Sequence, residues 1–372
     1  MILSNRHQKI QREIRELAQS VIAPRAKECD LNGKFVAENL QALKAGGYLG
    51  IPWPRELGGM GLDYLSYAIA VEEVSRACAA TGLTLAAHTS LGTYPIYKFG
   101  TEDQKKKFIP PLARGEHLGA FGLTEPNAGS DAAGIETSAR KVENGYIING
   151  SKRFITNAAF AGTVIVAATL DRKLGRRGIT CFIVETKSKG FIVAKEENKL
   201  GLRGSNTVEL AFDDLFVPEE NILGKEGDGY RIFMETLDGG RISIGAFCLG
   251  MAQSALDVLI KWAKERELSQ QAAKALADTA MEVEAARLLV YDAAVLKDGE
   301  VRADKQCAFA KLFASEVAMR AVNTAIATIG FPALTQEINL NRVYRDAKLG
   351  EIGEGTSEIM RLIIAKEVLK EA

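Results

Sequence analysis

The spacing of apolar residues changes twice along this chain of 372 residues, and that change constrains the fold more than any other feature. In the first part, apolar residues recur at helical spacing, as at Ile10, Ile14 and Leu17. This spacing predicts helices at 7–28, 36–48, 63–79, 82–99 and 102–114. We therefore expect an N-terminal helical domain.

Near residue 118 the pattern becomes typical of strands. Asn144-Gly145 and Asn149-Gly150 each stand between short β-prone runs, as in two-residue hairpin turns. Further strands are predicted at 163–169, 179–185, 190–195 and 207–212. Their spacing favours a small sandwich or barrel, and we expect Pro218 to close it.

From about residue 223 the helical period returns, for example at Met281, Ala285 and Leu288. Long helices joined by short connections are typical of an antiparallel bundle. The chain is also long for one core. We therefore predict an α+β multidomain protein, with an N-terminal α-helical domain at 1–117, a middle β-sandwich or barrel at 118–222 and a C-terminal four-helix bundle at 223–372.

Composition and missing motifs exclude several classes. Lys plus Arg equals Asp plus Glu at 47 each, so no net charge favours nucleic acid or an anionic membrane. Five scattered cysteines without a Cys-x-x-Cys pair, and only three histidines, argue against a metal site. Neither a strand-linked Gly-x-Gly-x-x-Gly nor a P-loop is present. Without a signal-peptide or membrane-span pattern, we expect a cytoplasmic protein with reduced thiols.

Two polar segments carry the chemical information. Residues 123–131, Leu-Thr-Glu-Pro-Asn-Ala-Gly-Ser-Asp, offer N–H and hydroxyl groups that can cradle a polar cofactor. Residues 351–358, Glu-Ile-Gly-Glu-Gly-Thr-Ser-Glu, place Glu354 between two glycines, just before an apolar helical pattern. A carboxylate on such an unhindered backbone is well placed to act as a general base.

In this order, the two segments resemble those of the acyl-CoA dehydrogenase flavoprotein family, most closely its short-chain, branched-chain or isovaleryl-type members. The resemblance extends over nearly the whole chain. Its other matching segments are Gly-Ser-Lys-Arg-Phe-Ile-Thr-Asn at 150–157, Leu-Gly-Leu-Arg-Gly-Ser-Asn-Thr at 200–207, Val-Pro-Glu-Glu-Asn-Ile-Leu-Gly at 217–224, Lys-Leu-Phe-Ala-Ser-Glu at 311–316 and Tyr-Arg-Asp-Ala-Lys at 344–348.

The resemblance implies that the protein binds FAD and oxidises an acyl-CoA thioester to the trans-2-enoyl product. The C2 proton would go to Glu354 and the C3 hydride to the flavin N5. The backbone N–H of Glu354 and a flavin ribityl hydroxyl would stabilise the enolate oxygen. The family's second location for the base precedes Arg241, where this chain has Gly240. The competing interpretation of Glu354 is a first-turn glutamate that favours the helix dipole.

The resemblance also implies the binding residues. For flavin they are Phe121, Leu123, Thr124, Gly129, Ser130, Phe154, Ile155, Thr156, Arg266, Thr356 and Glu358. For the thioester and pantetheine they are Ser130, Asp238, Arg241 and Gly355. The alternatives are a core role for Phe154, a helix cap for Thr356 and a plain surface ion pair for Asp238 and Arg241.

Three departures from the family pattern carry expectations of their own. Leu268-Ser269 follows Arg266 where an aromatic is usual, and Phe331-Pro332 replaces a glycine-rich turn. Both changes fall on contacts between subunits, so we expect FAD to be held less firmly across a homotetramer, with a dimer as the alternative. Gly353 stands where many relatives carry Tyr. We expect this gap to favour thioesters that are branched or cyclic near C3, unless His88 or Tyr94 fills it.

Three functions follow from the resemblance. The leading one is an acyl-CoA dehydrogenase that passes electrons to an electron-transfer flavoprotein, in the cytoplasm or, for a processed eukaryotic protein, in the mitochondrial matrix. The second is dehydrogenation of an acyl group on a carrier protein. The third is a flavin-poor scaffold, although a scaffold has no need of Glu354. The absorption spectrum of the purified protein, and its bleaching by acyl-CoAs, would distinguish them.

Overall fold

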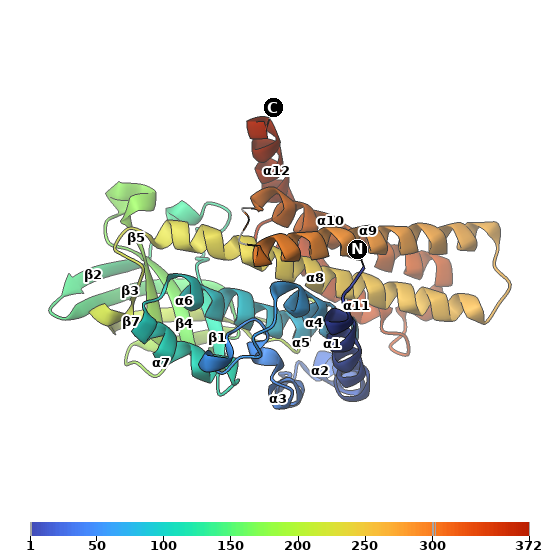
Figure 1. Ribbon diagram of the computed structural model, residues 1–372, viewed down its shortest axis with the longest axis horizontal. Coiled ribbons are helices and arrows are strands. Elements are labelled where there is room, and N and C mark those ends of the chain that lie inside the picture. The colour runs from blue at the N-terminus through green and yellow to red at the C-terminus, as the bar shows by residue number, and fades with distance from the viewer. Residues whose placement is uncertain (1, 300, 302, 372) are drawn as a thin grey trace.

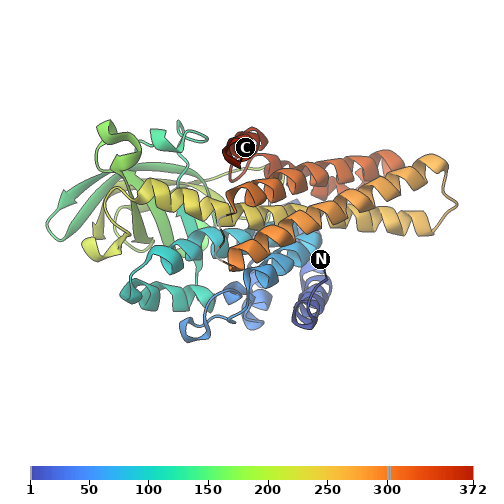
Figure 2. The same ribbon diagram turned by 45° about the horizontal axis from the view of Figure 1, so that its top comes forward.

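The computed structural model describes residues 2–299, 301 and 303–371. Helices come first along the chain, a β-sheet follows, and long helices complete it (Figure 1), which confirms the predicted order. The sheet occupies one end of an elongated molecule and the long C-terminal helices reach the other (Figure 1, Figure 2). The N-terminal helices pack alongside both parts.

The N-terminal part contains seven α-helices among the described residues. Pro24 lies just after the π-helical segment Ala18–Ile22, and the helical path continues past it to Asn32. The helix α4 is buried over most of its length and packs against the C-terminal helices. The bounds are α1 Asn5–Leu17, α2 Ala23–Asn32, α3 Ala37–Ala45, α4 Tyr64–Ala77, α5 Ala79–Ala86, α6 Tyr94–Phe99 and α7 Glu102–Ala113.

The middle part is one connected sheet in the order β6-β7-β3-β2-β4-β5-β8, with β1 pairing in parallel with β4. The hairpin predicted at Asn144-Gly145 is present, since Val142 pairs with Gly145 and Asn144 has a φ of 61°. The bounds are β1 Leu118–Gly122, β2 Ser138–Val142, β3 Gly145–Thr156, β4 Ala161–Thr169, β5 Ile179–Glu185, β6 Phe191–Glu196, β7 Thr207–Pro218 and β8 Ile222–Leu223.

The second predicted hairpin, at Asn149-Gly150, is wrong. The strand β3 runs through these residues without turning, and its register with β7 shifts between Ile148 and Gly150. A Cβ on Gly150 would lie 2.7 Å from Thr137 Cα, and its φ is 144°. The glycine therefore serves a bulge with close backbone approach, which has the same sequence signal as a turn.

The C-terminal part is built on three long helices that lie side by side, α8 Gly229–Lys264, α9 Gln270–Asp298 and α10 Asp304–Ile329. The short helix α11 Leu340–Ala347 follows, and α12 Ser357–Glu371 projects away from the body (Figure 1). Met281 and Leu288 on α9 are 66% and 40% exposed. The helical period is thus as predicted, but these apolar side chains face outward in the single chain.

The helix α8 is the one described helix that is long and apolar enough to cross a membrane. Its most apolar window has a mean hydropathy of 1.5, and 83% of that window is buried inside the structure. A central core helix meets the same criteria of length and composition. The burial therefore identifies α8 as the axis of the helical core.

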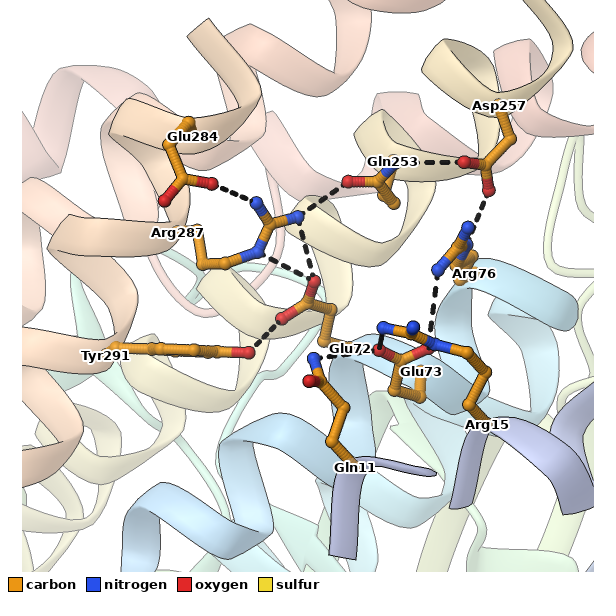
Figure 3. Close-up of polar contacts among 10 residues, drawn as sticks. All are labelled: Gln11, Arg15, Glu72, Glu73, Arg76, Gln253, Asp257, Glu284, Arg287 and Tyr291. Atoms are coloured by element: carbon orange, nitrogen blue, oxygen red, sulfur yellow. Dashed lines mark hydrogen bonds and ion pairs between the residues drawn. The ribbon is translucent and has the colours of Figure 1, made fainter. Parts of the chain in front are cut away.

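A buried polar network joins α1 and α4 to α8 and α9 (Figure 3). Glu72 accepts hydrogen bonds from Tyr291 at 2.6 Å and from Arg287 at 3.1 and 3.2 Å. Glu73 accepts two from Arg15, at 2.6 and 3.0 Å. Because removing one partner of a buried pair leaves an uncompensated charge, this network fixes how the helices dock.

Candidate active site

Glu354 lies in a turn between the 3-10 segment Lys348–Glu351 and α12. Its φ is 54° and that of Gly355 is 100°, so two successive residues have left-handed backbone conformations. A glutamate rarely adopts such a φ unless its surroundings impose it, and such residues cluster at functional sites. The turn directs the carboxylate inward, where Oε2 is buried.

The carboxylate of Glu354 occupies the space that a side chain at position 240 would take. A Cβ built on Gly240 would lie 2.0 Å from Glu354 Oε2 and 3.1 Å from Leu91 Cδ2. Gly240 lies in the middle of α8, where glycine costs about 1 kcal/mol relative to alanine. Glycine at position 240 therefore lowers the stability of the helix but leaves room for the carboxylate of Glu354, which lies 114 residues further along the chain.

Burial raises the pKa of Glu354 to about 7, and the positive charges of Lys311 and Arg241 oppose that rise. Glu354 Oε2 has no hydrogen-bond partner within the described part of the chain. An acid with a pKa near 7 can accept a proton and release it at neutral pH. The competing interpretation, a first-turn glutamate that interacts with the helix dipole, does not require a buried carboxylate.

Asp238 and Arg241 lie one turn apart on α8 and form an ion pair. Arg241 is buried, and its Nε lacks a partner among the residues described. Burial raises the pKa of Asp238 to about 6, against the opposing charge of Arg241. The pair is therefore not a plain surface ion pair. An unsatisfied guanidinium N–H beside Glu354 suits a ligand that carries oxygen.

The loop predicted to hold flavin is tied to β3 by a buried ion pair. Lys152 Nζ lies 2.6 Å from Glu125 Oε1 and also donates to the Leu123 carbonyl at 3.2 Å. Glu125 in turn accepts from the backbone N–H groups of Glu136 and Thr137. Leu123 and Thr124 are half-buried, whereas Gly129 and Ser130 are exposed. The pair thus fixes the base of the loop and leaves its tip free.

Two aromatic side chains flank this loop. Phe121 on β1 packs against Phe233 on α8, with ring centroids 4.5 Å apart, and so brings the loop to the helix that carries Asp238 and Arg241. Phe154 is 55% exposed, has a φ of 60° and lies beside the Arg153 guanidinium. Its ring is therefore not part of the sheet core. Ile155 is buried and Thr156 half-buried at the end of the same strand.

The remaining site residues are spread more widely. Thr356 Oγ1 accepts from the backbone N–H of Ile359 at 3.4 Å, which fits the capping role, and Glu358 is exposed beside it. Arg266 stacks on Trp262 beyond the far end of α8. From Arg241 to the end of this helix is about 35 Å at 1.5 Å per residue. Arg266 therefore does not join Glu354 within one chain.

Sequence reasoning missed the buried lysines Lys152 and Lys311, both with fully buried side chains. Both lie in segments that resemble the family, at 150–157 and 311–316. A signal was available, because each lysine interrupts an otherwise apolar face and a charged side chain is almost never fully buried unless paired.

Two clefts lie outside the site. Cavities of about 370 and 410 Å³ flank the polar network of Glu72 and Glu73. Glu73 and Glu72 in their walls are ion-paired with Arg15 and Arg287, and Glu354 lines neither cleft. No cluster of metal-ligating side chains occurs in residues 2–299, 301 and 303–371.

The residues present fit a flavin and an acyl thioester. The structure offers an exposed aromatic ring at Phe154, open space around Gly129, an unpaired donor at Arg241 Nε and an unpaired acceptor at Glu354 Oε2. These are the groups that a planar cofactor and a polarised carbonyl need. The arrangement can remove a proton from a carbon acid held beside Glu354.

Comparison with known proteins gives consistent matches along the chain. Residues 4–116, 120–215 and 227–369 match the family models for the acyl-CoA dehydrogenase N-terminal, middle and C-terminal domains. A probable acyl-CoA dehydrogenase of Bacillus subtilis strain 168 is 47% identical, over 99% of each chain. Butyryl-CoA dehydrogenase from Megasphaera elsdenii has a TM-score of 0.97 at 41% identity, over 99% of each chain.

A further similar structure was determined in work on the electron transferring flavoprotein of Acidaminococcus fermentans and flavin-based electron bifurcation. Its matching chain has a TM-score of 0.97 at 44% identity, and the match covers 100% of this chain and 99% of that one. The agreement in sequence and in fold extends across all three parts of the molecule.

Proposed function

The chain belongs to the acyl-CoA dehydrogenase family, and we propose that it oxidises a short-chain acyl-CoA to the trans-2-enoyl-CoA with Glu354 as the catalytic base. The enzyme is an FAD-dependent oxidoreductase. When bound, FAD supplies the hydride acceptor for C3. The observation that carries the role of Glu354 is its buried, unpartnered Oε2 in the space left by Gly240.

The chain's own residues account for the proton transfer. The carboxylate of Glu354 takes the C2 proton, and its pKa of about 7 makes it a stronger base than an exposed glutamate. Arg241, buried beside Gly240, orients the polar part of the thioester together with Asp238. Phe121, Leu123, Thr124, Gly129, Ser130, Phe154, Ile155, Thr156, Thr356 and Glu358 are proposed to hold FAD.

A short acyl chain fits the residues around Gly239 and Gly240. Leu91 approaches Gly240, and Tyr64 Oη donates to the Gly239 carbonyl at 3.1 Å. Tyr94 Oη is bonded to Lys297 Nζ at 2.7 Å, and Lys297 Nζ would lie 3.7 Å from a Cβ on Gly239. The polar pair Tyr94 and Lys297 would therefore limit the length of an acyl chain bound beside Glu354. The Megasphaera enzyme, named for butyryl-CoA, supports the same substrate class.

We also propose an assembly and an electron acceptor. Met281, Leu288 and Val295 recur every seven residues along an exposed face of α9, as expected of a helix that packs against another copy. Family membership favours a homotetramer. The similarity to a chain studied with an electron transferring flavoprotein favours that protein as acceptor.

The test is bleaching of the flavin absorbance by butyryl-CoA under anaerobic conditions. Wild type should bleach, and Glu354→Gln should bind flavin but react at least about 10²-fold more slowly, because it lacks the base. Glu367→Gln on α12, an ion-pair partner of Lys370, is the matched control and should react like wild type. A Glu354→Gln variant with more than about a tenth of the wild-type rate would refute the role of Glu354.

A further inference from the structure

Lys311 on α10 is a buried cation without an ion-pair partner in the described structure. Its side chain has no exposed surface, and its Nζ donates to the Gly355 carbonyl at 2.5 Å. Burying an ammonium group without a carboxylate partner is costly. The contact with the Gly355 carbonyl indicates why a lysine is buried here.

The Gly355 carbonyl belongs to the turn that carries Glu354. Both residues have positive φ, and each such residue is stable only where contacts hold it. The hydrogen bond from Lys311 reaches this turn from α10, the helix that packs against α12 and the 3-10 segment on either side of the turn. Losing that bond would free the peptide next to the catalytic carboxylate, and small errors in the position of a base slow proton transfer.

We propose that Lys311 is a positioning residue for Glu354, whose ammonium group anchors the Gly355 carbonyl and holds one positive charge beside the carboxylate. The proposal rests on Glu354 being the base, as argued above. Lys311 does not touch the substrate or the reacting atoms. It acts through the turn and through its electric field.

Arg241 also carries a positive charge near Glu354, but that charge is ion-paired with Asp238, whereas Lys311 has no ion-pair partner among the described residues. Burial raises the pKa of Cys248 to about 12 and those of Tyr64 and Tyr67 well above the usual range, so all three are neutral at pH 7. The groups that face Lys311 itself are Cys248 and Arg241 on α8, Glu351 at the end of the 3-10 segment, Glu354 in the turn and Glu358 on α12.

Lys311→Met and Lys311→Gln separate the charge from the hydrogen bond. The test is the pH profile of kcat/KM for butyryl-CoA with flavin-loaded enzyme. Removing the charge should raise the inflection assigned to Glu354 by about one unit in both variants, and so lower the rate about fivefold at pH 7. Gln keeps a donor for the Gly355 carbonyl, so its alkaline plateau should exceed that of Met. Arg320→Met is the control, since it removes an exposed charge from the same helix and should leave the profile unchanged.

The outcomes are distinguishable. A flavin-bound Lys311→Met whose inflection moves by less than about 0.3 unit would overturn the electrostatic role. Equal plateaus for Gln and Met would overturn the anchoring role. If Lys311→Met fails to hold flavin, the profile of Lys311→Gln decides in the same way. Wild type that no acyl-CoA bleaches would instead refute the proposed function.

Discussion

At the scale of single residues, the site gives up stability for reactivity. Glu354 has a folded pKa of about 7 against an ordinary value of 4.5, so the folded state binds this proton more tightly than the unfolded state does. Stability therefore falls as the pH rises from about 4.5 to about 7, and the loss is complete above that range. A shift of this size corresponds to at most about 3 kcal/mol.

We predict that Glu354→Gln stabilises the protein at alkaline pH. The amide is never ionised, so the free energy of unfolding should exceed that of wild type by about 1–3 kcal/mol at pH 8.5, and by much less at pH 5. Thermal and denaturant unfolding at both pH values measure the difference. A gain independent of pH, or a loss at pH 8.5, would contradict the burial argument.

At the scale of elements, the site is built where loops are fixed by buried charges. Lys152 and Glu125 tie the loop after β1 to β3, and Lys311 ties the turn before α12 to α10. Burial lowers the pKa of Lys152 to about 8, although Glu125 opposes this. In both places a lysine reaches from a regular element to an irregular segment that the proposed site uses.

Lys152→Met should loosen the loop at 123–131 that is proposed to hold flavin. Glu125 would be left buried without its cation, at a cost of about 3–5 kcal/mol, and flavin retention should fall. The double variant Lys152→Met/Glu125→Gln should be more stable than Lys152→Met, because the stranded charge is gone. Unfolding free energies and the flavin content after dialysis provide the test. A double variant less stable than the single one would contradict this account.

Gly353 should control the shape of the substrate. A Cβ here would meet Leu349 at 3.5 Å, an ordinary contact, and His88 is committed to the Gly119 N–H at 3.0 Å and so is not free to fill the gap. Gly353→Tyr should lower kcat/KM for isovaleryl-CoA relative to butyryl-CoA by about tenfold. Gly353→Ala, the control, should keep the wild-type ratio. The prediction would be wrong if wild type strongly preferred linear substrates and Gly353→Tyr left that preference unchanged.

The sequence predicts some of these elements and not others, for physical reasons. Helix periods and the Asn144-Gly145 turn are local signals, so the element order and this hairpin were predictable. Asn149-Gly150 failed because a bulge and a turn require the same glycine, and only the neighbouring Thr137 distinguishes them. Glu354 stood out through its flanking glycines. Its pairing in space with Gly240, and the anchors Lys152 and Lys311, depend on tertiary contacts that no local pattern contains.

At the scale of the whole molecule, the single chain leaves apolar surface uncovered. Met281 and Leu288 on α9, Phe331 after α10 and Leu362 on α12 are all exposed, Phe331 by 78%. These positions lie on the C-terminal helices and on the turn that follows α10. The domain limits 1–117, 118–222 and 223–372, the tetramer and the weakened FAD contacts between subunits stay predictions.

Leu288→Lys combined with Met281→Lys should split the assembly. Two charges on this face cannot be buried without partners, so the mass in light scattering should fall and FAD should be lost faster on dialysis. Lys274→Gln, on the same helix but within an exposed ion pair, is the control. An unchanged mass would exclude α9 as the interface. Wild type that keeps FAD through prolonged dialysis would contradict the weakened contacts.

The projecting helix α12 has a further consequence. Ser357 and Met360 are its only buried residues in the described chain, and a helix of fifteen residues is marginal when it lacks packing. Its first turn adjoins Glu354, so fraying that starts at the free C-terminal end and reaches this turn would disturb the proposed base while the rest of the fold stays intact. Where the proposed assembly covers α12, dilution that separates the subunits should expose a protease-sensitive site and stop turnover well before global unfolding, so that activity would depend on protein concentration.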